Sequence, residues 1–490
     1  MNNENNENNQ IIRNTDFDFE IKIKDKEGVI SFLRDFLKYL KVFGRYSKHS
    51  RQDLLTKMKD VKQYINWDKD IAKQFGETLK KMKRIIDTSD KIHQQNNMFD
   101  NSYSFFQIGQ LSKSFSSNEN EENENTTELN QYYMRFNHQV KAIACGSYHA
   151  LLLLNNGDIY SWGNGAFGRL GHGTIENHRY PTKIETVNQV KYITAGFAYS
   201  GCISDQNVSD QLYMWGATEN GRLGVGKEIN GEDILGQDVT IPTPVDCPHD
   251  IRFEKVTCGS THTCAISTQK HLYTWGNWKY CGKNISDHCD VFSPMKTESL
   301  SHIIFESVSI GPGGYHTMAL TTTGDLYTWG HNRVGQLGKD IQTNSQNIYS
   351  YISYVPQKIN TVDNIIDISA GWGHSAILTS NGKVMLCGRN TRSQLGIDTS
   401  ECQVNNRGHP YVSNFTEIDL PLFTKFIICG GEHTITVNNN REIYAWGDNE
   451  FNQLGNINNE GVLTPQKILD IDGDQCKISV GMQCSFIVWK

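Results

Sequence analysis

The chain has 490 residues, which is more than a single hydrophobic core accommodates unless the architecture is a repeat. Its hydrophobic content of 37% and its 42 glycines exclude a mostly disordered protein and favour a large core with frequent turns. The formal net charge of −7 leaves no general positive excess to hold a nucleic acid or an anionic membrane, so any such binding has to be local.

The first hundred residues differ in composition from the rest. Residues 1–20 begin with an asparagine-rich stretch, which predicts a disordered tail. Apolar residues then recur at helical spacing, so residues 28–95 are predicted to form a small α-helical region. Between Gly28 and Asp87 there are 15 Lys and Arg and 7 Asp and Glu, which leaves −15 for the remainder of the chain. Such basic helices could bind an acidic partner or nucleic acid, or their lysines could simply form a solvent-exposed outer face.

The chain shows no sign of export, membrane insertion or metal binding. Its start lacks a basic segment followed by an apolar one, and the longest aliphatic run, Ala150 to Leu154, is far shorter than a membrane span. The 12 cysteines form no Cys-x-x-Cys pair. We therefore expect an intracellular protein, cytoplasmic or nuclear, with reduced thiols, no metal and no cofactor.

From residue 138 the sequence repeats itself with a period of 50 to 63 residues. The first marker of each repeat is a glycine followed three residues later by a histidine. These pairs are Gly146 and His149, Gly259 and His262, Gly313 and His316, Gly371 and His374, and Gly430 and His433. Tyr199 and Cys484 replace the histidine in two copies.

Two further markers follow in fixed order. The second is a hairpin of apolar strands that ends in Trp-Gly, with tryptophans at Trp162, Trp215, Trp275, Trp329 and Trp446. Asn156-Gly157 stands between two such strands, where a tight turn needs positive φ. The third marker is Gly-x-Leu-Gly, as in Gly168 to Gly171, and a proline-bearing β segment comes after it.

Each repeat therefore predicts four short antiparallel strands, the composition of one propeller blade. Six full repeats occupy about 138–470, and residues 476–490 supply only one hairpin. Residues 99–137, with Tyr103 to Phe106 and Gly109 to Leu111, imitate the missing pieces, so we expect 99–137 and 476–490 to close a seventh blade around a disordered loop at 116–127. The predicted fold is all-β, a seven-bladed β-propeller over 99–490 of about 50-residue repeats, preceded by the helical region.

At these three markers the sequence resembles the regulator of chromosome condensation repeat family, whose founding member is the exchange factor of the GTPase Ran. The resemblance implies partner-facing residues on the loops between glycine and histidine, including acids. Among those loop positions in this sequence only Glu432 is acidic. The binding candidates are Tyr148, Tyr199, Tyr315, Trp372, Glu432 and Trp278, because aromatic side chains dominate protein contacts.

The repeated residues have competing interpretations. The histidines occur once per blade without carboxylate or thiol at ligand spacing, so structural hydrogen bonding is favoured over metal binding or catalysis. The tryptophans are assigned to packing between blades. A light-sensing cluster like that of the family's plant ultraviolet receptor would need several Gly-Trp-Arg-His loops, and only Gly371 to His374 comes close.

The sequence leaves two functions open. One is a non-catalytic regulatory or scaffold propeller that binds other proteins. The other is a guanine-nucleotide exchange factor for a Ran-like or Rab-like small GTPase, which works through binding energy and not covalent catalysis. We expect a monomer in either case, and binding of nucleic acid or chromatin only through the basic helices.

Overall fold

A computed structural model describes residues 11–14, 17–22, 104–109 and 138–489, with gaps at 230, 235, 246, 248–250, 284–288, 341–350, 361, 406, 456–460 and 472–475. The chain divides into two compact units, Met1–Asp100 and Asn101–Lys490. The predicted helical region 28–95 and the predicted loop 116–127 lie outside the described residues.

The described part of the first unit is a hairpin of β1 (Ile11–Asn14) and β2 (Phe17–Lys22). The predicted disordered tail over 1–20 is therefore wrong for these strands. The reason is visible in the sequence, because Phe17, Phe19 and Ile21 alternate with charged residues at the period of a strand.

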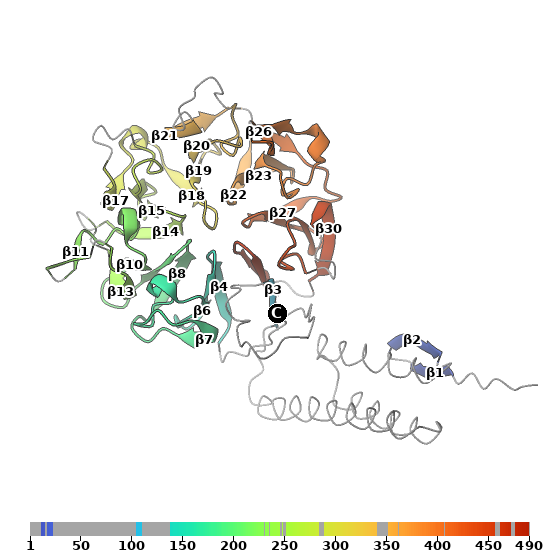
Figure 1. Cartoon of the computed structure of the whole chain (residues 1–490), viewed down its shortest axis with the longest axis horizontal. Helices are drawn as coiled ribbons and strands as arrows, with labels where there is room; N and C mark the ends of the chain where they lie inside the picture. The colour runs from blue at the N-terminus through green and yellow to red at the C-terminus, as the bar shows by residue number, and fades with distance from the viewer. Residues whose placement is uncertain are drawn as a thin grey trace, which may run out of the picture. The chain divides into compact units, whose positions relative to one another are not determined.

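The second unit contains six blades, each an antiparallel sheet of four or five strands. Figure 1 shows them following one another around a ring in chain order. The first strands of neighbouring blades contact each other around this ring, so they line its centre. The unit is therefore an all-β propeller with six complete blades. The only helices among its described residues are short 3-10 helices.

The first three blades have these strands. Blade 1 contains β4 (Val140–Cys145), β5 (His149–Leu154), β6 (Ile159–Gly163) and β7 (His178–Lys183). Blade 2 contains β8 (Val190–Ala195), β9 (Tyr199–Ser204), β10 (Gln211–Gly216) and β13 (Val239–Pro244). Blade 3 contains β14 (Phe253–Cys258), β15 (His262–Ser267), β16 (Leu272–Gly276) and β17 (Val291–Lys296).

The last three blades follow the same plan. Blade 4 contains β18 (Phe305–Ser309), β19 (His316–Thr321), β20 (Leu326–His331) and β21 (Ile352–Ile359). Blade 5 contains β22 (Ile365–Ala370), β23 (His374–Thr379), β24 (Val384–Arg389), β26 (Pro410–Glu417) and β25 (Gln403–Val404). Blade 6 contains β27 (Thr424–Cys429), β28 (His433–Asn438), β29 (Glu442–Gly447) and β30 (Val462–Asp470).

Minor elements occupy the loops of the ring. The 3-10 helices are η2 (Ala166–Gly168), η3 (Glu219–Gly221), η5 (Glu298–Leu300) and η7 (Thr399–Glu401). A small hairpin of β11 (Glu228–Ile229) and β12 (Glu232–Asp233) extends from blade 2.

Burial within a blade follows strand position. All six residues of β5 are buried, as are those of β9, β15, β19 and β23, because neighbouring blades cover both faces of each second strand. The outermost strands are more exposed and carry prolines, such as Pro181 in β7 and Pro465 in β30, at an edge where a missing N–H costs little. Gly157 has φ of 86° in the predicted Asn-Gly turn between β5 and β6.

A three-stranded sheet stands between blade 6 and blade 1. It pairs β3 (Ser104–Gly109) with β32 (Cys484–Trp489), and β32 with β31 (Cys476–Val480). β31 contacts both β27 of blade 6 and β4 of blade 1. Strands from the two ends of the second unit thus share one sheet.

A repeated hydrogen-bonded clasp joins most neighbouring sheets. His149 Nε2 lies 2.7 Å from Ser200 Oγ in the next blade, and that hydroxyl donates to the carbonyl of Arg169 in the Gly-x-Leu-Gly turn of the first blade. Because the hydroxyl proton is engaged, the histidine donates through Nε2. The equivalent pairs are His262 with Thr317, His316 with Ser375, His374 with Thr434 and His433 with Ser485.

The tryptophans strengthen the same joints. Trp215 donates to the Arg169 carbonyl at 3.0 Å, and Trp446 donates to the Gln394 carbonyl at the same distance. Trp215, Trp275, Trp329 and Trp446 have no exposed surface, and Trp162 retains 3%. The histidine and Gly-x-Leu-Gly markers of one repeat therefore meet the hydroxyl and tryptophan of the next.

Candidate functional site

The Gly-x-x-His loops lie together at one end of the inner strands, and we call this end the loop face. Backbone hydrogen bonds link the loops to one another, such as Ser147 N to Gly196 O at 3.1 Å and Phe197 N to Gly259 O at 3.0 Å. Further links run from Ser260 to Gly314, from Trp372 to Gly431 and from Gly431 to Gly481. The loops therefore form a connected platform and not independent flexible segments.

The loop of blade 4 is longer than its counterparts. The sequence paired Gly313 with His316, but Gly311 is the residue that packs against the next blade's Gly371, as Gly146 packs against Gly196. The assignment of Gly313 to this position is wrong, because two extra residues in this loop leave Gly313, and not Gly311, three residues before His316. The extra residues bring Gly313 close to Ser147 of blade 1 and Met482. This loop consequently reaches across the centre of the loop face.

Aromatic and guanidinium groups mark one side of the loop face. Half-buried Tyr148 packs edge-on against Phe197, with ring centroids 5.8 Å apart. The guanidinium of Arg169 lies 6.0 Å from the Tyr148 ring centroid and 5.3 Å from that of Phe167, and it donates to the Phe197 carbonyl. Burial lowers the pKa of Arg169 to about 10, so it keeps its charge at neutral pH.

Tyr315 and Trp278 each sit beside another aromatic ring. Tyr315 is half-buried, and its ring centroid lies 5.3 Å from that of Tyr280. Trp278 is also half-buried and stacks on Tyr354 of β21 with centroids 5.4 Å apart. Both candidate side chains therefore expose part of a ring whose orientation is fixed by its neighbour.

Trp372 and Glu432 belong to one row of alternating groups, which we call the charged row. Arg389 lies 4.9 Å from the Trp372 ring centroid, and its Nη1 is 3.1 Å from Oε1 of Glu432. Arg392 Nε lies 3.9 Å from both Glu432 Oε2 and Asp448 Oδ1, and its Nη2 is 3.4 Å from Glu450 Oε2. Burial raises the pKa of Glu432, while the two arginines oppose that rise.

One predicted binding residue does not belong to the surface. Tyr199 has no exposed area, and its hydroxyl donates to the His262 carbonyl at 2.6 Å. It fills the histidine's place in the clasp between blades 2 and 3, so the prediction of a partner contact for Tyr199 is wrong. The structure places Tyr148, Tyr315, Trp372 and Glu432 on the loop face.

Sequence reasoning missed the arginines of the charged row. Arg389 and Arg392 follow Cys387-Gly388, the variant of the Trp-Gly marker. Gly388 pairs with His374 in the β23–β24 ladder, and Arg389 N bonds to the Gly373 carbonyl, so the residue after this glycine must lie beside the Gly-x-x-His loop. The alignment of the glycine after Cys387 with His374 could therefore have identified the arginines as residues of the loop face.

The described residues of the loop face are binding groups, and no catalytic set is assembled among them. Within the described ranges no group of three His, Cys, Asp or Glu side chains could hold a metal ion. The His149–Ser200 pair has the distance of a nucleophile and its base, but both residues are fully buried and the serine proton already bonds to a carbonyl. Burial also holds the pKa of His149 well below its usual value.

Two family models match the repeats. One model of the regulator of chromosome condensation (RCC1) repeat matches residues 156–203, 209–266, 323–378 and 442–488. A second model of the same repeat matches residues 140–169, 253–282, 306–336 and 365–394, and together the two cover more than half of the chain. The chain belongs to the RCC1 repeat family.

Curated relatives of this RCC1 repeat protein differ widely in size and activity. Ultraviolet-B receptor UVR8 of Arabidopsis thaliana is 29% identical over 325 residues, which cover 65% of this chain and 67% of the receptor. The mitochondrial RCC1 domain-containing protein RUG3 of the same plant is 29% identical over 265 residues, 53% of this chain and 56% of RUG3. The human ubiquitin ligase HERC2 is 25% identical over 65% of this chain, which spans only 6% of the ligase.

Solved structures agree with the RCC1-type propeller fold. Prp20p of Saccharomyces cerevisiae superposes with a TM-score of 0.63 at 21% identity, covering 79% of this chain and 92% of that chain. Human WBSCR16 superposes with a TM-score of 0.61 at 18% identity, covering 73% and 89%. In the part of the RCC1 repeat protein that the structure describes, no helix is long and apolar enough to cross a membrane.

Proposed function

We propose that this protein is a non-catalytic regulator or scaffold whose loop face binds a protein partner. The charged row carries the proposal, since it aligns a partly exposed tryptophan, two arginines and three carboxylates on connected loops. Tryptophan, tyrosine and arginine are the side chains that most often dominate protein-protein binding energy. Fixed loops also lose little conformational entropy on binding.

Site-specific photo-crosslinking in cells tests this proposal. A photoreactive phenylalanine analogue replaces Tyr148, Tyr315 or Trp372, and a matched control places it at Leu463, which is 64% exposed on the outer strand β30. We expect a discrete adduct from the loop-face positions and none from position 463. Adducts at 463 alone, or at none of the three loop positions, would contradict the proposal.

A second candidate function is nucleotide exchange on a Ran-like or Rab-like small GTPase. Glu432 favours it, because it is a carboxylate on a Gly-x-x-His loop, where the family resemblance expects acids. The described arginines Arg389 and Arg392 already neutralise Glu432, so a GTPase would have to compete with them. The solved structure of Prp20p is described together with that protein's binding to Gsp1p and histones.

Release of a fluorescent guanine nucleotide from a panel of such GTPases separates the two candidates. Acceleration by about tenfold or more, a loss of about 1.4 kcal/mol from the barrier to release, would establish exchange. The Glu432→Lys variant should then lose most of that acceleration. If the protein accelerates nucleotide release from none of these GTPases, the exchange function is excluded for them and the scaffold function is favoured.

We also propose that the β3-β32-β31 sheet is the seventh blade of the ring. Its position between blade 6 and blade 1 and its use of strands from both ends of the unit support this assignment. Closure would satisfy the sheet edges that an open ring leaves exposed. The predicted fourth strand at 129–137 lies outside the described residues.

An intracellular location, cytoplasmic or nuclear, accompanies the proposal. All 12 cysteines are free thiols, which fits a reducing compartment. Imaging a fluorescent fusion of the full chain would test it, and a mitochondrial or secreted signal would overturn it.

A further inference from the structure

A basic hollow opens on the side of the ring opposite the loop face. It has a volume of about 710 Å³ and lies among blade 6, the β3-β32-β31 sheet and blade 1. Lys141, Lys425 and Lys477 line it, and each is the second residue of an inner strand, β4, β27 or β31. The Gly-x-x-His loops come after the other ends of these strands, so the hollow and the loop face are separate surfaces.

The three lysines of this hollow have no described carboxylate beside them. Lys141, Lys425 and Lys477 are exposed, Arg441 also lines the hollow, and no carboxylate is among the described lining residues. Among the described residues, no ion pair engages any of the three lysines. Lys191, at the same position of β8, differs because it pairs with Asp205 at 2.7 Å and Asp210 at 2.9 Å.

Apolar side chains lie between these cations. Ile143, Phe426 and Val437 line the same hollow. A bare inorganic anion gains nothing from such walls, whereas an apolar side chain buried there contributes about 25 cal/mol per Å².

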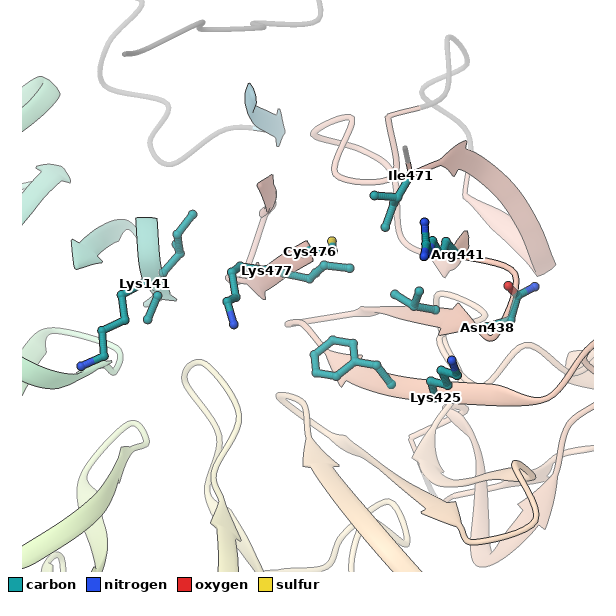
Figure 2. Close-up of a pocket in the computed structure, with 12 residues that line it drawn as sticks. Lys141, Lys425, Asn438, Arg441, Ile471, Cys476 and Lys477 are labelled. Atoms are coloured by element: carbon teal, nitrogen blue, oxygen red, sulfur yellow. The ribbon is translucent and has the colours of Figure 1, made fainter. Parts of the chain in front are cut away.

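The arrangement of the charges selects an extended ligand. Figure 2 shows the basic side chains of Lys141, Lys477, Lys425 and Arg441 standing apart along the hollow, and their charged ends do not meet at one point. Four separated cations match several spaced negative charges better than they match one phosphate group. A peptide in extended conformation also places alternate side chains on opposite sides, which suits acids alternating with apolar residues.

We propose that this basic hollow binds an extended acidic peptide segment of a partner protein, with apolar residues between its acids. The site is a second interface beyond the loop face. A partner held here and another on the loop face would be joined by one rigid ring.

Fluorescence anisotropy with a defined peptide tests the site. The probe is a labelled peptide that alternates glutamate with leucine and phenylalanine, and the matched probe carries glutamine in place of every glutamate. The full chain should bind the acidic probe at least about tenfold more tightly than the neutral one, and this preference should decline as salt rises. Equal binding of the two probes would overturn the proposal.

Variants locate the binding on the chain. Lys425→Ala with Lys477→Ala should weaken binding of the acidic probe about tenfold, because two of four cations are lost. Lys191→Ala, the matched control with an already paired lysine, should change it less than about twofold. Unchanged binding in the double variant with an intact thermal transition would contradict the assignment.

Two further measurements separate this site from its alternatives. Tripolyphosphate binding without acidic-peptide binding would replace the peptide by a phosphate ligand and overturn the proposal. Trp372→Ala changes only the loop face and should leave peptide binding unchanged. A failure of the basic-hollow proposal can thus be told from a failure of the loop-face function.

Discussion

The joints between consecutive sheets of the ring differ from the joint beside the sheet that holds both ends of the second unit. Six joints carry a clasp in which a histidine, or Tyr199 in one case, bonds to a hydroxyl or carbonyl of the next sheet. The joint between the β3-β32-β31 sheet and blade 1, which we call the closing joint, has Cys484 at the histidine position and Ala150 at the hydroxyl position.

The closing joint is instead mainly apolar. Trp162 and Phe486 pack edge-on with centroids 5.5 Å apart, beside buried Leu152 and Leu154. A hydrogen bond with Cys145, together with burial, raises the pKa of Cys484 well above its usual value, so Cys484 stays a protonated thiol. The antiparallel ladder between β3 and β32 joins the first and last described strands of the second unit by backbone hydrogen bonds. The comparison teaches that the repeat's polar markers bond consecutive sheets, while the closing joint is held by apolar packing and by strand pairing within its sheet.

The largest effect should come from removing residues 476–490. This deletion takes away β31 and β32, exposes Leu152 and Trp162 of blade 1, and leaves β3 without a partner. We expect the thermal midpoint to fall by more than about 10 °C, since each buried large side chain contributes about 1.5–3 kcal/mol. Differential scanning calorimetry measures the shift. A transition unchanged from that of the full chain would refute closure of the ring by this sheet.

A smaller effect should distinguish the two kinds of joint directly. His374→Ala removes a fully buried ring and its bond to Thr434, which should cost about 2–4 kcal/mol of unfolding free energy. Cys484→Ala removes a single sulfur from the closing joint and should cost about 1 kcal/mol. Urea denaturation compares them. Equal costs would show that the clasp adds nothing to ordinary packing.

The sequence predicted the repeat and its strand order well, because each blade carries its own turn and strand signals. The Asn156-Gly157 turn and the fully apolar run Ala150 to Leu154 need no long-range information. Burial of Tyr199 was not predictable, since a loop position looks exposed until the next blade is packed on it. The pairing of Arg389 with Glu432 joins blade 5 to blade 6 across 43 residues and depends on both registers together.

The pH dependence of stability should also separate the joints. Burial lowers the pKa of His262, His316, His374 and His433 to about 3, whereas the unfolded chain protonates near 6.5. The unfolded state therefore binds more protons between these values, so stability is full above pH 6.5 and is lost as pH falls toward 3. His374→Gln should reduce the slope by up to about 1.4 kcal/mol per pH unit.

Urea midpoints across this pH range supply that slope, and Cys484→Ala provides the control. The raised pKa of Cys484 keeps its thiol protonated throughout this window, so the control should shift stability by the same amount at every pH. If Cys484→Ala changes the slope of stability against pH as much as His374→Gln does, the loss of stability in acid does not originate in the clasps.

The smallest effect on stability should come from Arg392 of the charged row, which takes part neither in a histidine clasp nor in the closing joint. Arg392 is half-exposed, and its nearest carboxylate oxygens lie 3.4 to 3.9 Å away. Arg392→Ala should therefore change unfolding free energy by no more than about 0.5 kcal/mol. If urea denaturation shows a loss several times larger, the row is part of the structure of the ring and not a surface kept for a partner. A small loss combined with weaker crosslinking at Trp372 would separate the residues that hold the blades together from those that are free to bind.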